Sequence, residues 1–307
     1  MVSVIRIDKL FKSFGEIRAV DGISFQVEQG EIFGFLGPNG AGKTTTMRLL
    51  TGVIRPDGGS VVVDGVDVAH KRLEAQARMG IVPETSNVYQ ELSARNNLIF
   101  MGELHGMHRR ERDARADELL ETFGLAERAN STVKGFSKGM KRRLVLAMAL
   151  IHDPSLILLD EPVSGLDVQS QRLIRERIRE LNDEGRTIFI TTHDMEEANR
   201  LCHRVAIIDH GTIAAIDTPE GLKSAFNRTQ AVEFSFRENV PIQAIQALEG
   251  AMRVESKGDK YRVITSDPIS VVEEVIQLAR ERGTQALAVN TLGPSLEDVF
   301  VELTGGA

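Results

Sequence analysis

The sequence predicts an α/β fold built on a mainly parallel sheet, followed by a smaller α+β domain. Residues 37–45 form a complete phosphate-binding loop, G-x-x-x-x-G-K-[ST], between a strand-like run at 31–36 and a helix-like run at 45–50. Residues 156–159 are a short apolar run typical of a buried parallel strand. Strands and helices then alternate to residue 216, and the pattern changes near residues 225–230.

The phosphate-binding loop indicates a nucleoside triphosphate site. Its glycines let backbone N–H groups turn around an anion, and the N-terminus of the following helix favours negative charge there. We expect Lys43 to reach the β- and γ-phosphates and Thr44 to hold Mg²⁺. A Gly-rich turn with a chance lysine is the alternative, disfavoured by the strand and helix on either side. The loop residues predicted to bind nucleotide are Gly37, Pro38, Asn39, Gly40, Ala41, Gly42, Lys43, Thr44 and Thr45.

The apolar run at 156–159 ends in two carboxylates, Asp160 and Glu161. Carboxylates at the C-terminal end of a parallel strand emerge where open α/β sheets bind ligands. Asp160 is therefore predicted to coordinate Mg²⁺, and Glu161 to polarise an attacking water as general base. An acidic turn at a strand end is the plainer interpretation, but the phosphate-binding loop makes it less attractive.

The composition narrows the classes of partner. Of 307 residues, 42% are hydrophobic, and the net charge of −7 argues against a broad nucleic-acid-binding surface. A single cysteine, Cys202, excludes an intrachain disulfide and fits a reducing cytosol; we expect it to pack in the core rather than bind metal with His203. No signal-peptide pattern or apolar run near ~18 residues is present. We therefore expect a soluble chain that reaches a membrane only through a partner.

The segment Phe136-Ser137-Lys138-Gly139-Met140 lies between the two phosphate-site motifs. It is similar to the L-S-G-G-Q signature of ATP-binding cassette (ABC) proteins: Ser137 and Gly139 match, whereas Phe136, Lys138 and Met140 depart from it. Residues 1 to about 220 resemble the nucleotide-binding subunit of an ABC transporter. The resemblance implies an ABC cassette at 1–225, with a mixed core sheet, an antiparallel β layer and a helical subdomain at about 85–150. It also implies that Ser137 and Gly139 face the γ-phosphate of ATP on an opposing subunit.

Further positions match the same family. Asp167 ends a segment at 164–167 that corresponds to the loop crossing the dimer interface, and His193 corresponds to the switch histidine at the γ-phosphate. Phe14 occupies the place of the aromatic residue that stacks on adenine. Phe11 is a competing candidate, although it is better explained as a core residue.

One position departs from the family pattern in a way that bears on chemistry. Glu84 stands where a glutamine usually contacts Mg²⁺ or the attacking water, and Gln90 is a less suitable substitute by register. A glutamate keeps an oxygen ligand but adds a negative charge. The resemblance therefore implies that Glu84 belongs to the nucleotide and metal site, and its charge predicts altered ATP affinity or turnover.

Residues 230–307 have the order β-α-β-β-α-β typical of a ferredoxin-like sandwich, followed by a helix at 295–303. The final segment resembles the tail of ABC-2 type ATPase subunits for drug or polysaccharide export. This accessory domain is either a regulatory or dimer-stabilising module, or a cap over the edge of the core, and the sequence leaves both interpretations open.

The resemblance implies an ATPase subunit that uses ATP and Mg²⁺ to power export through a separate multi-span membrane permease. It implies a homodimer with two ATP sites, working at the cytoplasmic face of the membrane, with Lys43, Glu161 and His193 catalytic and no nucleic-acid partner. The substrate is not predicted, because its contacts lie in the permease. A soluble ABC-type ATPase acting on ribosomes or DNA is the main alternative. A kinase or GTPase explains neither the 136–140 segment nor His193.

Overall fold

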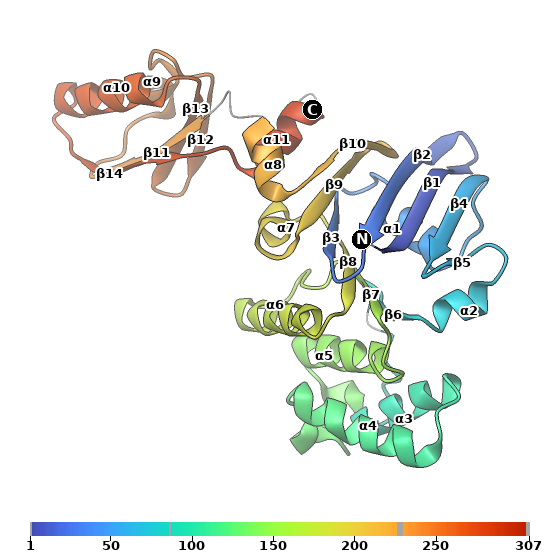
Figure 1. The fold of residues 1–307 in the computed structure, drawn as a ribbon. Helices are drawn as coiled ribbons and strands as arrows, with labels where there is room; N and C mark the ends of the chain where they lie inside the picture. The colour runs from blue at the N-terminus through green and yellow to red at the C-terminus, as the bar shows by residue number, and fades with distance from the viewer. Residues whose placement is uncertain (1, 86, 226–229, 305–307) are drawn as a thin grey trace. The chain divides into compact units, whose positions relative to one another are not determined.

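A six-stranded sheet in the computed structural model carries the phosphate-binding loop (Figure 1). Its order is β10-β9-β3-β8-β7-β6, with all neighbours parallel except β10, which runs antiparallel to β9. All residues of β3, β7 and β8 are buried, as is typical of parallel strands covered on both faces. The strands are β3 (Ile32–Leu36), β6 (Met79–Val82), β7 (Leu156–Asp160), β8 (Thr187–Thr192), β9 (Arg204–Asp209) and β10 (Thr212–Asp217).

A second, antiparallel sheet has the order β2-β1-β4-β5. It consists of β1 (Ser3–Phe14), β2 (Ile17–Glu28), β4 (Gly58–Val63) and β5 (Val66–Asp67). Phe25 of this sheet stacks on Phe33 and Phe189 of the parallel sheet, with ring centroids 5.3 and 6.1 Å apart. These aromatic contacts join the two layers into one core.

The alternation that predicts strands covers only residues 2–8 and 23–28, whereas β1 and β2 extend further. Pairing between β1 and β2 contains several register shifts, and Lys9 adopts a positive φ of 43°. Each irregularity moves side chains to the other face, so hydrophobic alternation stops signalling a strand although the pairing continues. By contrast, the Asp-Gly pair between β4 and β5, which is typical of a hairpin turn, is a local signal that the structure follows: Asp64 and Gly65 both have positive φ, as a type I′ turn requires.

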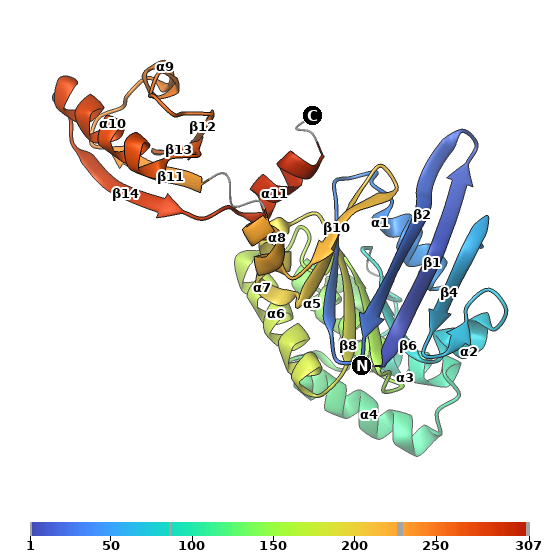
Figure 2. The same cartoon turned by 45° about the horizontal axis from the view of Figure 1, so that its top comes forward.

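The helices divide between the sheet core and a helical subdomain (Figures 1 and 2). Helix α1 (Lys43–Leu50) contacts strands of both sheets, α2 (Arg72–Gln76) precedes β6, and α6 (Val168–Asp183) and α7 (Met195–Leu201) pack on β8. The subdomain predicted at about 85–150 contains α3 (Ala94–Leu104), α4 (Arg109–Thr122) and α5 (Lys138–Ala149), with short 3-10 turns at Ala126–Arg128 and Val133–Gly135. Helix α5 packs on β6 and α6 as well as on α3 and α4, so it connects the subdomain to the core.

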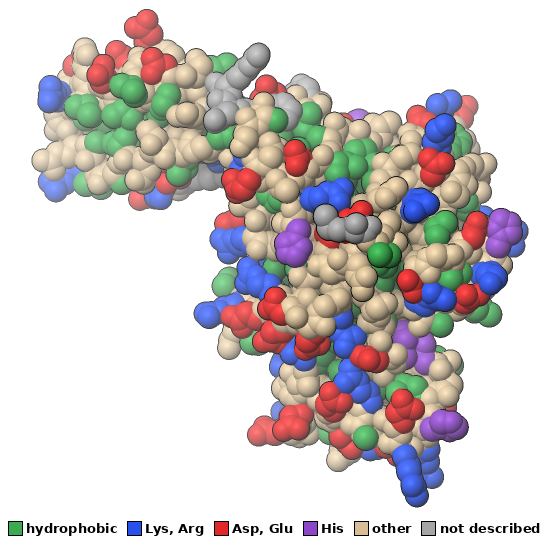
Figure 3. All heavy atoms as spheres, in the orientation of Figure 1, with side chains coloured by type: hydrophobic (Ala, Val, Ile, Leu, Met, Phe, Trp, Pro, Cys, Tyr) green, Lys and Arg blue, Asp and Glu red, His purple; other side chains and the backbone are tan. Residues whose placement is uncertain are grey.

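Charged side chains of both signs are interspersed on the face of the molecule drawn in Figure 3, including the surface of α4. Arg109 pairs with Asp113 on that helix, and Arg112 pairs with Glu103 of α3. Residues 109–111 are exposed, whereas Arg112 and Asp113 are half-buried, so this charged run is solvated only in part. Among residues 2–85, 87–225 and 230–304, which are those the structure describes, no helix has the length and apolarity needed to span a bilayer.

The second unit begins at Pro219 and has its own core. Its sheet has the order β12-β13-β11-β14, and Phe234, Tyr261, Val271 and Val275 are buried between the sheet and its helices. The predicted β-α-β-β-α-β order is present. Its elements are α8 (Pro219–Ala225), β11 (Gln230–Phe236), α9 (Ile242–Gln246), β12 (Arg253–Lys257), β13 (Lys260–Thr265), α10 (Pro268–Glu281), β14 (Ala286–Leu292) and α11 (Leu296–Leu303).

The division between the units falls between Thr218 and Pro219, one helix earlier than the predicted boundary at 225–230. Residues 226–229, which form most of that predicted boundary, lie outside the described residues. Helix α8 packs on α11, the last helix of the chain, and therefore belongs to the second unit. A contact between segments so far apart in the sequence leaves no local signal in residues 219–225.

Candidate active site

The phosphate-binding loop joins β3 to α1 and needs glycine at two points. A side chain at Gly37 would place its Cβ 2.3 Å from the carbonyl oxygen of Ile208, and one at Gly42 would come within 2.4 Å of the carbonyl oxygen of Ala19. Gly42 also has a positive φ of 110°. The backbone of β2 and β9 therefore packs directly against the loop and fixes its path.

Lys43 is buried at the start of α1, with only 6% of its surface exposed. Its Nζ donates hydrogen bonds to the carbonyl oxygens of Gly37 (2.7 Å) and Pro38 (3.1 Å) and lies 3.6 Å from Oε1 of Glu161. Burial lowers the pKa of Lys43, and the Glu161 carboxylate opposes that shift. The ammonium group is thus held where the loop, α1 and the end of β7 meet.

Glu161 follows β7 directly and adopts a left-handed backbone conformation, with φ of 47°. Its N–H donates to the carbonyl of Thr191 (3.0 Å), and its Oε1 lies 2.9 Å from Nδ1 of His193. His193 follows β8, the strand next to β7. Parallel strands bring these two residues together although they are far apart in the sequence.

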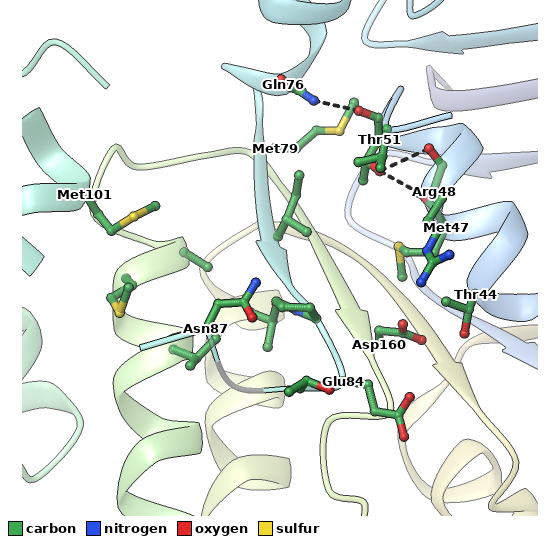
Figure 4. Close-up of a pocket in the computed structure, with 18 of the residues that line it drawn as sticks. Thr44, Met47, Arg48, Thr51, Gln76, Met79, Glu84, Asn87, Met101 and Asp160 are labelled. Atoms are coloured by element: carbon green, nitrogen blue, oxygen red, sulfur yellow. Dashed lines mark hydrogen bonds between the residues drawn. The ribbon is translucent and has the colours of Figure 1, made fainter. Parts of the chain in front are cut away.

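Asp160 is buried at the last position of β7 and accepts a hydrogen bond from the Thr191 hydroxyl. Thr44 of α1, Asp160 and Glu84, which follows β6, line one continuous groove (Figure 4). Hydroxyl and carboxylate oxygens are the ligands that Mg²⁺ prefers, and Mg²⁺ in phosphate sites usually keeps only one or two protein ligands. In the part of the chain that is described, no group of three or more His, Cys, Asp or Glu side chains is arranged to hold a metal by itself. The donor set fits a cation shared with phosphate oxygens.

A cavity of about 270 Å³ lies among the phosphate-binding loop, Glu84, Glu161 and His193, whereas Asp160 lines only the groove of Figure 4. The loop residues Gly37 and Ala41 are not part of the lining but support it: Gly37 binds Lys43, and Ala41 donates to Pro38. The phosphate-binding loop and the residues Glu161 and His193, which are far apart in the sequence, thus line one cavity. Its lining residues are Ala19, Pro38, Asn39, Gly40, Gly42, Lys43, Thr44, Thr45, Glu84, Glu161, Ser164 and His193.

A larger groove of about 740 Å³ adjoins the cavity and shares Thr44 and Glu84 with it. In Figure 4, Met79 and Met101 lie away from the end of the groove that carries Thr44 and Asp160. Burial lowers the pKa of His152, which also lines the groove, to about 4. The groove is mainly apolar and runs between the sheet core and the helical subdomain.

The predicted site residues Ser137, Gly139 and Asp167 also do not line this cavity. Ser137 and Asp167 cap the N-termini of α5 and α6, and both are exposed. Gly139 is buried, and a Cβ there would come within 2.3 Å of Oγ of Ser170, so α5 and α6 approach each other closely at this point. The structure therefore does not bring Ser137, Gly139 or Asp167 to the cavity of their own chain.

Phe14, the predicted adenine-stacking residue, is also absent from the cavity lining. It is 50% exposed at the end of β1, with Lys12 Nζ 5.5 Å from its ring centroid. Phe11, expected in the core, is only half-buried, and the Arg18 guanidinium lies over its ring. Cys202, in contrast, is buried as predicted, and Nδ1 of His203 accepts a hydrogen bond from the N–H of Ile32.

Sequence reasoning missed two buried charged residues beside the site. Arg142 of α5 binds backbone carbonyls at the ends of β6 and β7. Glu197 of α7 accepts a hydrogen bond from the hydroxyl of Thr192, the residue before His193. The apolar spacing of α5 and α7 contained the signal, because both residues fall on the buried face of their helix.

Comparison with known proteins agrees with this geometry. The model of a family described as ABC transporter matches residues 20–164. The Nod factor export ATP-binding protein I of Paraburkholderia xenovorans is 40% identical over 99% of this chain and 97% of its own length. The chain belongs to the ABC transporter family. It is an ATP-binding subunit of the exporter type, and an ATPase.

Further relatives of this ABC subunit are similar over most of their length. The linearmycin resistance ATP-binding protein LnrL of Bacillus subtilis is 35% identical and aligned over 98% of both chains. Among solved structures, the dimer of the ATP-binding cassette MJ0796 in a post-hydrolysis state with ADP and Pi has a TM-score of 0.64 and 25% identity, covering 70% of this chain and 98% of that one. The predicted family and the cassette fold are therefore confirmed.

Proposed function

We propose that two copies of this subunit close on two ATP molecules and thereby drive export through a separate multi-span membrane permease. The main observation in support is that the predicted site residues lie in two separate places on the chain. Lys43, Glu161 and His193 meet in one cavity, whereas Ser137 and Asp167 stand exposed on other helices of the same chain. A head-to-tail pair of chains would bring the second group to the first, and the MJ0796 cassette, a structural neighbour, is itself a dimer.

Within each site, the loop N–H groups and Lys43 would bind the phosphates. Phosphate oxygens would compete with Glu161 for Lys43, because both are anions within reach of the same ammonium group. Glu161, then held by His193, would polarise the attacking water, and Ser137 of the second copy would bind the γ-phosphate. Thr44, Asp160 and Glu84 would hold Mg²⁺, which neutralises charge that develops on the phosphates.

We further propose that the permease docks in the groove beside this cavity, placing the chain on the cytoplasmic face of a membrane. The groove combines a mainly apolar lining with residues 83–85, 87 and 89. The resemblance to ABC transporter subunits implies that a membrane subunit docks near residues 85–91, of which residue 86 lies outside the described residues. Because Glu84 lines both groove and cavity, an occupant of the groove would contact the segment that reaches the nucleotide. Names of relatives, such as Nod factor export and linearmycin resistance, support export. The net charge of −7 supports a partner other than nucleic acid.

Replacement of the proposed base tests the chemistry. We expect Glu161→Gln to lower kcat by about 10²-fold or more, because general-base catalysis is lost, and to accumulate an ATP-bound dimer. ATP turnover and size-exclusion chromatography with ATP measure the two effects. The matched control is Glu196→Gln, an exposed glutamate on α7 that should leave both unchanged. Parental turnover in the Glu161→Gln variant would remove Glu161 from its role.

Fractionation tests the partner. The tagged chain should sediment with membranes that contain the permease, and it should leave that fraction when the permease is deleted. Sedimentation with ribosomes, or with DNA, in a nuclease-sensitive manner would favour the alternative class of soluble ABC ATPases.

A further inference from the structure

Arg142 has an unusual environment for a charged side chain. It is 4% exposed, and it makes five hydrogen bonds to five backbone carbonyls. Nε donates to Pro162 (2.8 Å), Nη2 donates to Asp160 (2.8 Å) and Glu161 (3.0 Å), and Nη1 donates to Pro83 and Glu84 (3.3 Å for Glu84). Every N–H of the guanidinium therefore has an acceptor.

The acceptors come from two segments that the catalytic site needs. Three of them are the consecutive carbonyls of residues 160–162, and two belong to the end of the β6 segment at 83–84. An arginine has five donors in a planar fork, so it can satisfy both segments at once. A lysine has three donors on one nitrogen, so it cannot reach both sides. The position is therefore specific for arginine rather than for positive charge.

The contacts with residues 160–162 bear on the direction of the Glu161 side chain. Glu161 has a left-handed φ of 47°, a conformation that a residue with a side chain keeps only when its surroundings hold it. Its N–H is held by the carbonyl of Thr191, and its own carbonyl and those on either side are held by Arg142. Released from Arg142, this turn is free to relax, and the carboxylate then moves away from His193.

We propose that Arg142 is a positioning residue for ATP hydrolysis, which holds Glu161 in its catalytic orientation and fixes the Pro83–Glu84 segment against it. Arg142 makes no hydrogen bond to residues 37–45 in the described structure, so we expect its replacement to affect turnover more than nucleotide binding. The link to the 83–84 segment also places Arg142 between the groove proposed for the permease and the base. This inference rests on the proposed role of Glu161.

The test compares neighbouring arginines on one helix. Arg143 also binds carbonyls, those of Phe123 (2.8 Å) and Gly124 (3.4 Å), but these lie in the helical subdomain. We expect Arg142→Lys to lower kcat by about 10- to 100-fold, since small misplacement of a catalytic group costs this much, while the dissociation constant for ATP stays within about twofold. Arg143→Lys should change neither quantity by more than about twofold.

Several outcomes overturn the inference. They are a parental kcat in a folded Arg142→Lys protein, an equal loss of kcat in Arg143→Lys, and a loss of ATP binding that accounts for the loss of turnover. If Arg142→Lys does not fold, as judged by its melting curve, Arg142→Gln is measured against the same criteria, since its amide keeps two N–H donors. Failure of this inference can be told apart from failure of the proposed export function, because the ATP turnover and the ATP-driven dimerisation of the parent protein are measured in the same experiment.

Discussion

The two regions of this chain that are proposed to bind ATP phosphates differ in how far one chain organises them. At the start of α1, Lys43 is buried and held by carbonyls of its own loop and by Glu161, which is itself buried and held by His193. At the starts of α5 and α6, Ser137 and Asp167 are exposed and bind mainly the N–H groups of their own helices. Under the proposed function, the first region would be a preorganised half-site, and the second would contribute only when another chain covers it.

A charge at the exposed region should have the largest effect on turnover. We expect Ser137→Glu to lower kcat by about 10²-fold or more, because a carboxylate would face the γ-phosphate of ATP on the other chain. ATP binding by the isolated chain should be unchanged, since Ser137 does not line its cavity. Turnover and fluorescent-nucleotide titration check the two effects. Ser224→Glu, an exposed serine of the second unit, is the control. Loss of ATP binding in the Ser137→Glu monomer would erase the contrast between the regions.

Removal of the buried Lys43 ammonium group should instead weaken ATP binding by the single chain. We expect Lys43→Ala to weaken ATP binding by the single chain about 10- to 100-fold, the usual worth of charge-assisted hydrogen bonds. The same titration measures it, with the exposed Lys71→Ala as control. Undiminished affinity would show that the buried region does not bind phosphate.

A smaller effect on ATP affinity or turnover is expected at Glu84, which stands where the family usually has glutamine. Glu84→Gln removes a negative charge that lines the cavity with Lys43 and should change ATP affinity or turnover about threefold to tenfold. Glu91→Gln, an exposed glutamate in the same segment, serves as control. Steady-state kinetics at several Mg²⁺ concentrations would locate the effect, and identical curves for Glu84→Gln and the parent would exclude Glu84 from the site.

The smallest effect on turnover, below about twofold, is expected at Glu197, whose variant should instead change stability. Burial raises the pKa of Glu197 to about 7, above its ordinary value of 4.5. Between these values the folded chain holds a proton that the unfolded chain has lost, so the free energy of unfolding falls as pH rises through this window. Glu197→Gln should therefore be more stable than the parent by up to ~3 kcal/mol at about pH 8, with little difference near pH 4.5.

Urea unfolding of the Glu197→Gln variant and the parent at the two pH values checks this prediction. The control is Glu196→Gln, because Glu196 is the exposed neighbour on the same helix. A stability difference independent of pH would contradict a buried, protonated carboxyl.

The sequence predicted the parts of the fold that local pattern determines. Continuous apolar runs gave β3, β7 and β8, and glycine spacing gave the loop that binds Lys43. His193 was placed at the γ-phosphate by the resemblance to ABC proteins, and it lies beside Glu161 because neighbouring parallel strands end at one edge of a sheet. The order of elements in the second unit was predictable from local pattern, since each element has its own hydrophobic periodicity.

What depended on long-range contact was not predictable. The place of α8 in the second unit comes from its packing on α11, and the full length of β1 comes from pairing that continues across bulges. The five carbonyls around Arg142 belong to segments 18 to 59 residues away in the chain, so no spacing rule indicates them. The apolar spacing of α5 indicates that Arg142 falls on the buried face of the helix, but it does not indicate the partners of Arg142.

Mixing two defective variants tests most directly whether the site is shared between chains. Lys43→Ala and Ser137→Glu proteins are each expected to be nearly inactive. In a mixed head-to-tail dimer, one site has both defects and the other has none, so equal amounts should recover about a quarter of parental turnover. Recovery at that level is the result we predict. A mixture no more active than its components, in a preparation where mixed dimers are present, would contradict a site built from two copies.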